Sequence, residues 1–445
     1  MSYSFIGGYF LNSYYARFEE AVNLASSKFS ESDHDDESPI ITTAGSSLPS
    51  TYKLVRARNV GMTALLLFVR DPNAVLSIEE AEVGFGAAQM GNKGAVSMRV
   101  LYQVPKGDQT ELTFVATHLA AMEWNLPRRN ANWATIMRGL TFQDPEEISS
   151  PKKRRQTDAT VDGSVDGGDS DADSPESAEE AVRLLHDQHH EESLRLQEKL
   201  QDISVFKPSS HLFVGGDLNY RIATQSPRPL ADFPSLDPDS DHYYPRYFQL
   251  DQLTRERRAG RTLHGLSEAA VRFPPTYKYV ILPVDSNTPG DDLDVPWVFA
   301  RHRFPGWTDR ILYMDVPPWA KAQNPDTPDM KVQAYNAMPV VATSDHRPVF
   351  LRADVPILDA QAMVPPRKRV TAAREEWWKP EWDADPRVAL PVAIDPEAWG
   401  RREAGRRKEV VAGWSMFLWS TREGALVLAT LMVVGLGSWW LWQSV

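Results

Sequence analysis

The C-terminal part of the chain contains 19 consecutive residues without a charge, Gly424–Trp442. As an α-helix this run is about 28 Å long at ~1.5 Å per residue, close to the hydrocarbon thickness of a bilayer. A helix that is apolar on all sides fits the middle of a protein core, and chain ends seldom lie there. The Trp residues near its end are typical of a membrane interface. The run therefore predicts a transmembrane tail anchor over 424–442.

The segment before this run is basic, and basic residues tend to stay on the cytosolic side of a membrane. They are Arg401, Arg402, Arg406, Arg407 and Lys408. These residues predict that the rest of the chain lies in the cytosol, with 357–423 as a linker and juxtamembrane segment. Trp414, Phe417 and Leu418 are expected in the membrane interface.

Composition excludes several function classes. The sequence has no cysteine, which excludes a disulfide framework, a thiolate zinc site and a phosphatase mechanism with a cysteine nucleophile. The net charge is -12, but the segment from Asp144 to Asp202 holds 17 acidic and 7 basic side chains, which leaves about -2 for the other residues. The acidity is therefore local. The absence of a basic excess elsewhere argues against a nuclease that binds duplex DNA.

Short runs rich in β-branched residues and bounded by turn residues predict strands along most of the chain. They are Met62–Val69, Ala95–Leu101, Leu112–Thr117, His211–Gly215, Ile311–Met314, Val340–Thr343 and Val349–Ala353. Helical stretches such as Pro127–Leu140 lie between them, a pattern typical of an α/β domain with two packed sheets. An acidic insertion over 143–205 interrupts it. Gln143–Ser177 is expected to be disordered and Glu179–Leu200 to form a solvated helix.

Five short motifs occur in a fixed order. They are Gly91-Asn92-Lys93-Gly94; Thr117-His118-Leu119-Ala120-Ala121 with Arg129-Asn130; Gly216-Asp217-Leu218-Asn219-Tyr220-Arg221; Pro275-Thr276-Tyr277-Lys278-Tyr279 with Pro305-Gly306-Trp307-Thr308-Asp309-Arg310-Ile311-Leu312; and Ser344-Asp345-His346-Arg347-Pro348. Each alone reads as a turn or a strand end. Together they closely resemble the inositol polyphosphate 5-phosphatases, a branch of the endonuclease, exonuclease and phosphatase superfamily. The resemblance implies an α/β, DNase-I-like four-layer sandwich of two mixed sheets flanked by helices, over 1–356.

Asp217 and Asn219 follow an apolar strand, so they are expected on a loop at its end, where active sites tend to lie. Hydrolysis of a phosphate ester needs a positioned water, a base and groups that bind the phosphoryl oxygens. The resemblance implies that Asp217 activates the water and Asn219 orients it. It also implies that His346 pairs with Asp309, which would raise the pKa of the imidazole and orient it. The alternatives are an ordinary turn and a structural histidine.

Further residues are assigned to substrate binding by the same resemblance. His118 ends a third strand and is an expected active-site contact to phosphate, while Asn130 is expected to shape the pocket. Asn92 and Lys93 lie in a glycine loop that lets the backbone approach a ligand, with the lysine as a point charge. The spacing of this loop is not that of a Walker motif. On its own the tetrapeptide indicates only a turn.

A cluster of cations and phenols lies near Asp309 in the sequence. Its members are Tyr277, Lys278, Arg301 and Arg303. In members of the family that act on phosphoinositides, similar residues bind a second ring phosphate at position 4. A solvated basic loop is the alternative for the two arginines.

Magnesium dependence is implied by the family, whose main metal ligand is the Glu of a Gln-Glu pair. The first ten residues resemble the stretch that directly follows this pair, and the pair is not found in these 445 residues. Two explanations are open: an incomplete sequence, or a protein that has lost strong metal binding. Asp345 is the expected ligand for Mg²⁺ among the residues present.

These patterns predict a phosphatase that removes the 5-phosphate of phosphatidylinositol 4,5-bisphosphate, or of a related soluble inositol polyphosphate, by metal-assisted attack of water. Its expected partners are this substrate and a membrane, and no nucleic acid. By analogy with tail-anchored relatives, the expected site is the cytosolic face of the endoplasmic reticulum. Two alternatives are open: a nuclease or phosphodiesterase of the superfamily, and a catalytically impaired, membrane-tethered protein that binds phosphoinositides. The sequence predicts no oligomeric state.

Overall fold

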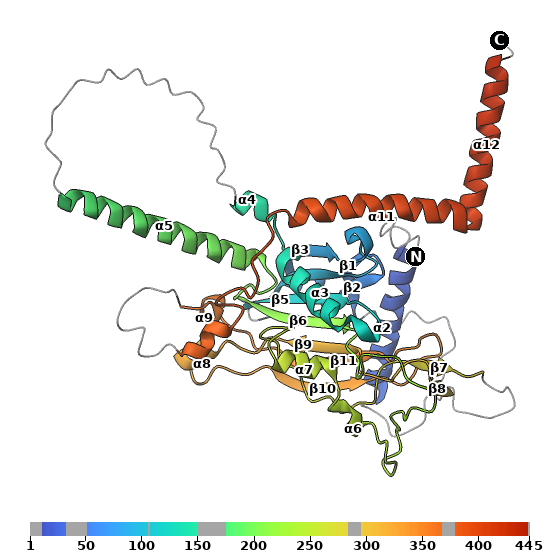
Figure 1. Cartoon of the computed structure of the whole chain (residues 1–445), viewed down its shortest axis with the longest axis horizontal. Coiled ribbons are helices and arrows are strands. Elements are labelled where there is room, and N and C mark those ends of the chain that lie inside the picture. The colour runs from blue at the N-terminus through green and yellow to red at the C-terminus, as the bar shows by residue number, and fades with distance from the viewer. Residues whose placement is uncertain are drawn as a thin grey trace.

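A five-stranded mixed sheet forms the centre of the computed structural model, which describes residues 11–32, 51–105, 107–149, 175–283, 295–366 and 379–443. Its strands, in spatial order, are β3 (Val75–Gly84), β4 (Gly94–Gln103), β5 (Gln109–His118), β6 (Ser210–Asp217) and β9 (Asp309–Tyr313). Neighbours are antiparallel except β5 and β6, which are parallel. The ends of β5 and β6 therefore meet the start of β9 at one edge of the sheet (Figure 1).

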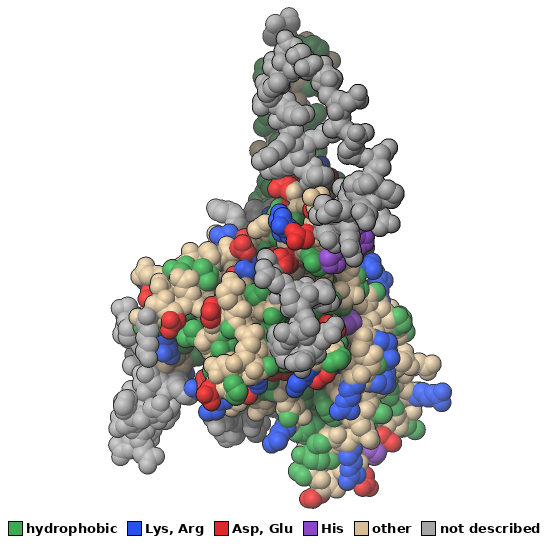
Figure 2. All heavy atoms as spheres, turned by 90° about the vertical axis from the view of Figure 1, so that its left-hand side faces the viewer, with side chains coloured by type: hydrophobic (Ala, Val, Ile, Leu, Met, Phe, Trp, Pro, Cys, Tyr) green, Lys and Arg blue, Asp and Glu red, His purple; other side chains and the backbone are tan. Residues whose placement is uncertain are grey.

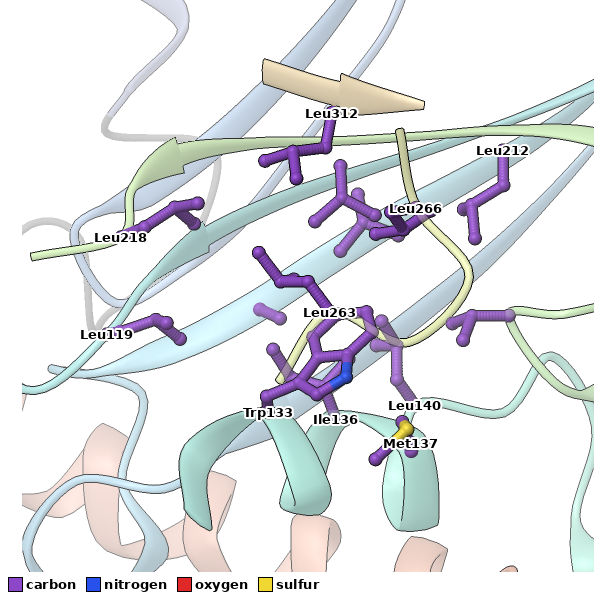
Figure 3. Packing of buried hydrophobic residues seen from close by; sticks show 14 of the residues in the cluster. Leu119, Trp133, Ile136, Met137, Leu140, Leu212, Leu218, Leu263, Leu266 and Leu312 are labelled. Atoms are coloured by element: carbon purple, nitrogen blue, oxygen red, sulfur yellow. The ribbon is translucent and has the colours of Figure 1, made fainter. Parts of the chain in front are cut away.

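Helix α3 (Leu126–Gly139) covers one face of this sheet, because its apolar side chains recur three or four residues apart. Trp133 and Ile136 are fully buried, and Figure 3 shows them pointing toward Leu212 of β6 and Leu312 of β9. Leu253 of α7 (Gln252–Arg258) joins the same core. The sheet and α3 thus hold the edge with the strand ends on a rigid support.

The opposite face of the sheet receives the hairpin of β1 (Lys53–Val60) and β2 (Thr63–Val69). Val96, Met98 and Val100 of β4 are buried, at the alternate positions that a strand presents to one face. Helix α2 (Asn12–Ser32) lies beside β1, where Glu19 Oε1 accepts the backbone N–H of Leu54 at 3.0 Å.

Two further hairpins complete the strands. β10 (Lys331–Ala337) pairs with β11 (Val349–Asp354) beside β9, and β7 (Tyr279–Ile281) pairs with β8 (Trp297–Phe299). The expected helix-flanked sheets are present, but among the described residues the second sheet is divided into hairpins, because no strand joins β1–β2 to β10–β11. The predicted strand Val340–Thr343 is wrong. It is the loop between β10 and β11.

Short elements connect these parts. They are η2 (Pro72–Ala74), η3 (Ala87–Gln89), η4 (Glu123–Asn125), α4 (Pro145–Ser149), α6 (Pro245–Phe248), α8 (Pro318–Gln323), α9 (Ala360–Met363) and η5 (Pro380–Ala384).

The predicted helix of the acidic insertion is confirmed as α5 (Pro175–Ile203), which projects from the rest of the molecule in Figure 1. The stretch expected to be disordered falls mostly outside the described residues, but α4 makes its first part helical. The end of the predicted insertion belongs to the domain: Val205 is buried in the main core, and Arg99 donates to the carbonyl of Ser204 at 2.5 Å.

Much of the segment expected to be a linker is folded within its described parts, 357–366 and 379–423. Within it, α11 (Ala398–Ser420) packs along β3 and α3 through a buried stripe at helical spacing, and Phe417 belongs to that stripe rather than to an exposed interface. Helix α12 (Arg422–Gln443) then turns away from α11, and its hydrophobic side chains stand clear above the body of the molecule (Figures 1 and 2). It is the one helix of the described chain that is long and apolar enough to cross a membrane.

Candidate active site

Three of the predicted site residues are neighbours across the sheet. His118 at the end of β5 is in register with Asp217 at the end of β6, and Asp217 is in register with Asp309 at the start of β9. The strand order therefore brings together residues that are far apart in the sequence. Gly216 is required beside them, because it has φ +135° and a Cβ there would lie 2.1 Å from the carbonyl oxygen of Thr117.

The Asp217 carboxylate is held on both oxygens. The backbone N–H of Asn219 donates to Oδ1 at 3.0 Å, its side-chain amide donates to Oδ2 at 2.8 Å, and His118 Nε2 lies 3.2 Å from Oδ2. Asn219 has φ +56°, a conformation that asparagine tolerates better than most residues. Burial alone would raise the pKa of Asp217, but the hydrogen bond and charge of His118, with two other cationic groups, outweigh it and lower the pKa.

Asp309 and His346 form the expected pair, with Nδ1 and Oδ2 2.9 Å apart. Hydroxyl groups of Thr276 and Thr308 donate to the same oxygen at 2.7 and 2.8 Å, which fixes the carboxylate. Burial and the nearby charge of Asp217 raise the pKa of Asp309, against the opposing hydrogen bond from His346. Burial alone would lower the pKa of His346, but its bond to Asp309 and the neighbouring carboxylates raise it. The raised pKa of His346 favours a protonated imidazole, with its Nδ1–H donated to Asp309.

Asp217, Asp309 and His346 each place a ligand atom within 4.8 Å of the others, close enough to share a cation. Hard divalent cations prefer oxygen ligands, and Mg²⁺ usually retains several waters beside one or two carboxylates. The two aspartates fit this description, whereas His346 Nδ1 is already bonded to Asp309. Asp345, the ligand expected from the sequence, lies outside this group of three and forms a salt bridge with Lys278, 2.5 Å from its ammonium nitrogen.

Lys93 reaches the same place from the loop between β3 and β4. Its ammonium nitrogen contacts His118 Nε2, and this imidazole nitrogen lies 3.2 Å from Asp217 Oδ2. His118 therefore connects Lys93 to Asp217. Burial lowers the pKa of Lys93 to about 8. Asn92, predicted with it, is exposed and lies against Gly86, where a Cβ would be 1.7 Å from the Asn92 Oδ1.

The predicted second-phosphate cluster lies on the other side of His346. The Tyr277 ring is 4.7 Å from the His346 ring and lies under the Arg221 guanidinium at 4.2 Å. Lys278 is adjacent, and its carbonyl accepts the N–H of Ala300 at 3.0 Å, which brings the following loop alongside. Tyr277, which is 8% exposed, thus packs against His346 and lies 5.3 Å from the Lys278 ammonium.

The two arginines of that loop have protein partners of their own. Arg301 lies 5.2 Å from the Phe233 ring and is otherwise exposed, and Arg303 Nε is 3.5 Å from the buried carboxylate of Glu123. Asn130 also points away from the phosphate contacts: its amide donates to Glu256 at 2.8 Å. We therefore place Asn130 in the support beneath the site.

Sequence reasoning missed several residues that touch these groups. Arg221 bonds Asn219 and stacks on Tyr277, while the Thr276 and Thr308 hydroxyls hold Asp309. All three lie inside the motifs quoted above. Their place in the motifs could have indicated a role in the site. Residue type alone, however, did not distinguish these three residues from residues that only stabilise the fold.

The arrangement combines a carboxylate of lowered pKa and an imidazole of raised pKa at the edge of a rigid sheet, with two lysines nearby. Such a set is suited to bind a phosphate and to take a proton from a water beside it.

Comparison with known proteins agrees with this chemistry. The sequence profile described as endonuclease/exonuclease/phosphatase family 2 matches residues 12–352, and the chain belongs to this family. It is 25% identical over 360 residues to polyphosphatidylinositol phosphatase INP53 of Saccharomyces cerevisiae, which covers 79% of this chain and 24% of that protein. It is 31% identical over 273 residues to type II inositol polyphosphate 5-phosphatase 15 of Arabidopsis thaliana, covering 60% and 20%.

A third relative is synaptojanin-1 of Homo sapiens, 25% identical over 334 residues that cover 70% of this chain and 16% of that protein. The chain thus spans about a quarter or less of the length of these relatives. The solved inositol polyphosphate 5-phosphatase domain of spSynaptojanin, in complex with inositol (1,4)-bisphosphate and a calcium ion, aligns at 24% identity with a TM-score of 0.39, over 67% of this chain and 61% of that one.

Proposed function

We propose that the chain is a phosphoinositide 5-phosphatase that acts on phosphatidylinositol 4,5-bisphosphate or a related inositol polyphosphate. The observation that carries the proposal is the meeting of His118, Asp217, Asp309 and His346 at one edge of the sheet. Relatives named as inositol polyphosphate and polyphosphatidylinositol phosphatases support the substrate class. The absence of cysteine from the sequence excludes a thiolate as the nucleophile, and we propose water in its place.

In the proposed reaction Asp217 is the general base. Its lowered pKa keeps the carboxylate ionised at neutral pH, so it accepts a proton as the water oxygen bonds to phosphorus. Asn219 fixes the carboxylate and orients the water. The bond between phosphorus and the ring oxygen then breaks, and the ring oxygen takes up one proton. Because Asp217 has taken one proton from the water, the net number of protons does not change. The products are inorganic phosphate and a ring hydroxyl.

Positive groups around Asp217 stabilise the charge that develops on the phosphoryl oxygens. His346, held protonated by Asp309, donates a hydrogen bond to one oxygen, and the ammonium of Lys93 binds a second. Asp217 and Asp309 would hold a divalent cation, proposed to be Mg²⁺, which when bound supplies further positive charge against the phosphate.

We assign Tyr277 and Lys278 to the phosphate at position 4, next to the one removed, because Tyr277 packs on His346 and the Lys278 ammonium lies 5.3 Å from the Tyr277 ring. Arg301 and Arg303, on the neighbouring loop, are assigned to the same phosphate. A substrate with two adjacent ring phosphates would then contact His346 with one phosphate and Lys278 with the other.

Helix α12 is proposed to anchor the chain to the cytosolic face of an intracellular membrane, with the endoplasmic reticulum as the candidate. Its length, apolar surface and exposure support an anchor. Attachment confines the enzyme to the surface that carries its lipid substrate, which raises the effective concentration of that substrate.

The test is phosphate release from vesicles that contain phosphatidylinositol 4,5-bisphosphate, with the full chain and Mg²⁺. Asp217→Asn is expected to lower kcat by about 10²- to 10⁴-fold. Asp241→Asn is the matched control, because this carboxylate is 98% exposed. Equal rates for the wild type and Asp217→Asn would contradict the proposal. Cleavage of a short DNA duplex without lipid hydrolysis would indicate a nuclease. Lipid binding without hydrolysis would indicate a membrane-tethered protein that binds phosphoinositides and does not cleave them.

A further inference from the structure

Helix α11 lies between the catalytic domain and α12, and one buried stripe attaches it to the domain. The stripe consists of Ala398, Arg402, Gly405, Glu409, Gly413 and Phe417, at the three- and four-residue spacing of a single helix face. Two members of this stripe are charged. A charged side chain on a buried face needs partners, since removing it from water is costly. The partners of Arg402 and Glu409 therefore show what α11 is attached to.

Glu409 is attached to the loop that carries Lys93. Its side chain is 5% exposed, and Oε1 accepts the backbone N–H of Gly91 at 2.6 Å. Arg402 completes the pairing, with Nη2 donating to Glu409 Oε2 at 3.0 Å and Nε donating to Glu82 at 2.8 Å. Gly91 and Glu409 are 318 residues apart in the sequence. The contact thus joins the membrane-proximal helix to the loop between β3 and β4.

Glycine at position 405 permits this approach. A Cβ there would lie 2.8 Å from the carbonyl oxygen of Gln89, a distance that real Cβ atoms essentially never show. At Gly400 of the same helix a Cβ would meet nothing within 4 Å. The helix therefore packs tightly against the loop backbone at Gly405 and has open space at Gly400.

The loop that α11 holds ends in the candidate active site. Lys93 follows Gly91 by two residues, its carbonyl accepts the N–H of Phe85 at 2.9 Å, and its ammonium contacts His118. A shift of Gly91 therefore moves the ammonium relative to His118 and Asp217. Since a displacement of about 1 Å in a catalytic site can cost about 10²-fold in rate, the position of this loop matters for the reaction.

From these contacts we infer that Glu409 is a positioning residue: through Gly91 it holds the loop that sets Lys93 against the substrate phosphate, and so connects the membrane-proximal helix to the active site. This role rests on the proposed phosphatase function. Helix α12 follows α11 after a tight turn, in which a Cβ at Gly424 would lie 2.1 Å from the Phe417 carbonyl oxygen. Helix α11, within the predicted linker, thus connects the proposed anchor α12 to the loop of the candidate active site.

The test compares two glycine variants of the full chain in vesicles, Gly405→Ala and Gly400→Ala. Both make the same change in the same helix, and the second places its methyl group in open space. Gly405→Ala is expected to increase amide hydrogen exchange across residues 86–94 and to lower kcat by about tenfold or more, with Gly400→Ala unchanged in both. A global fall in stability would raise exchange in the core strands as well.

A second pair tests the acceptor itself. Glu409→Gln keeps an oxygen that can accept the Gly91 N–H, so it is expected to recover most of the activity that Glu409→Leu loses. Glu403→Gln on the exposed face, where Glu403 pairs with Arg407 of the same helix, is the control. Unchanged loop exchange and unchanged kcat in both Gly405→Ala and Glu409→Leu would overturn the inference.

The two proposals fail in distinguishable ways. A wild-type chain that releases no phosphate would contradict the proposed function, and the exchange of residues 86–94 would still decide whether Glu409 holds the loop. A wild-type chain that is active, with Gly405→Ala as active as Gly400→Ala, would contradict only the positioning role.

Discussion

The pair formed by Asp309 and His346 makes a prediction that depends on both charge and tautomer. In Asp309→Asn the amide replaces an ionised acceptor 2.9 Å from Nδ1. Burial, which lowers the pKa of His346, then acts with less opposition, so the imidazole loses its proton at lower pH than in the wild type. The expected result is a lower rate at neutral pH and a pH optimum that moves toward acid.

The size of the loss follows from the bond that is removed. A hydrogen bond to a charged group contributes about 1.5–3 kcal/mol, and about 1.4 kcal/mol corresponds to a tenfold change in rate. The side chains are 25% and 19% exposed, so water screens the pair only in part. We therefore expect kcat/KM to fall by about 10- to 150-fold at neutral pH, with part of the activity restored in acid.

The assay is the pH dependence of kcat/KM on a soluble inositol polyphosphate, measured below the pH of about 8 at which Lys93 titrates. Asp241→Asn controls for the loss of one carboxylate at an exposed position. An equal loss at every pH would refute the proton-donor role of His346, because it would show that Asp309 acts only through the structure or through the cation that it would hold with Asp217. An unchanged rate at neutral pH would refute the role of the pair.

Three further predictions follow from single side chains. Because burial lowers the pKa of Lys93 to about 8, its charge is lost as the pH rises through that value; kcat/KM should fall there, and Lys93→Arg should move the fall to higher pH in the same assay. Burial lowers the pKa of His211 from 6.5 to about 4, so the unfolded chain binds the proton at a higher pH than the folded chain. About 3 kcal/mol of stability should therefore be lost as the pH falls from 6.5 to about 4. Urea unfolding at several pH values should show this loss, and His211→Gln should lack it. Trp133→Ala, at a fully buried position, should lower the free energy of unfolding by ~3–5 kcal/mol in urea titrations, while Trp124→Ala, 59% exposed, should change it little.

Part of the site was predictable, because His118 and Asp217 each end a strand whose pattern is clear in the sequence. The strand predicted before His346 is a loop, yet His346 still joins Asp217 and Asp309 in one group. What the strand patterns do not contain is the strand order, which decides which ends meet. Asp345 illustrates the limit: next to His346 in sequence, it turns to Lys278 and away from the cluster.

The support beneath the site was harder to predict, because a polar side chain can serve a ligand or the fold with the same residue type. Asn130 was expected in the pocket and instead bonds Glu256, which Arg261 also holds. Arg310, inside a quoted motif, is fully buried between Asp251 and Glu268. Such networks are satisfied by partners distant in sequence, and no local pattern names those partners.

Helix α11 shows why a segment can be misread even when its residues are informative. From the sequence it was expected within a linker and juxtamembrane segment, and its basic residues served only as evidence for the cytosolic side of a membrane. Arg402 does not face water, because Glu82 of β3 and Glu409 of the same helix neutralise it in a buried position. The useful signal was the set of small residues at Gly405 and Gly413, in step with those charges, since a helix with glycines on its charged stripe can approach another backbone closely. In α11, a helix face that combines small residues with oppositely charged ones packs against the domain, although the helix is rich in charge. The surface that this face contacts is the loop that carries Lys93.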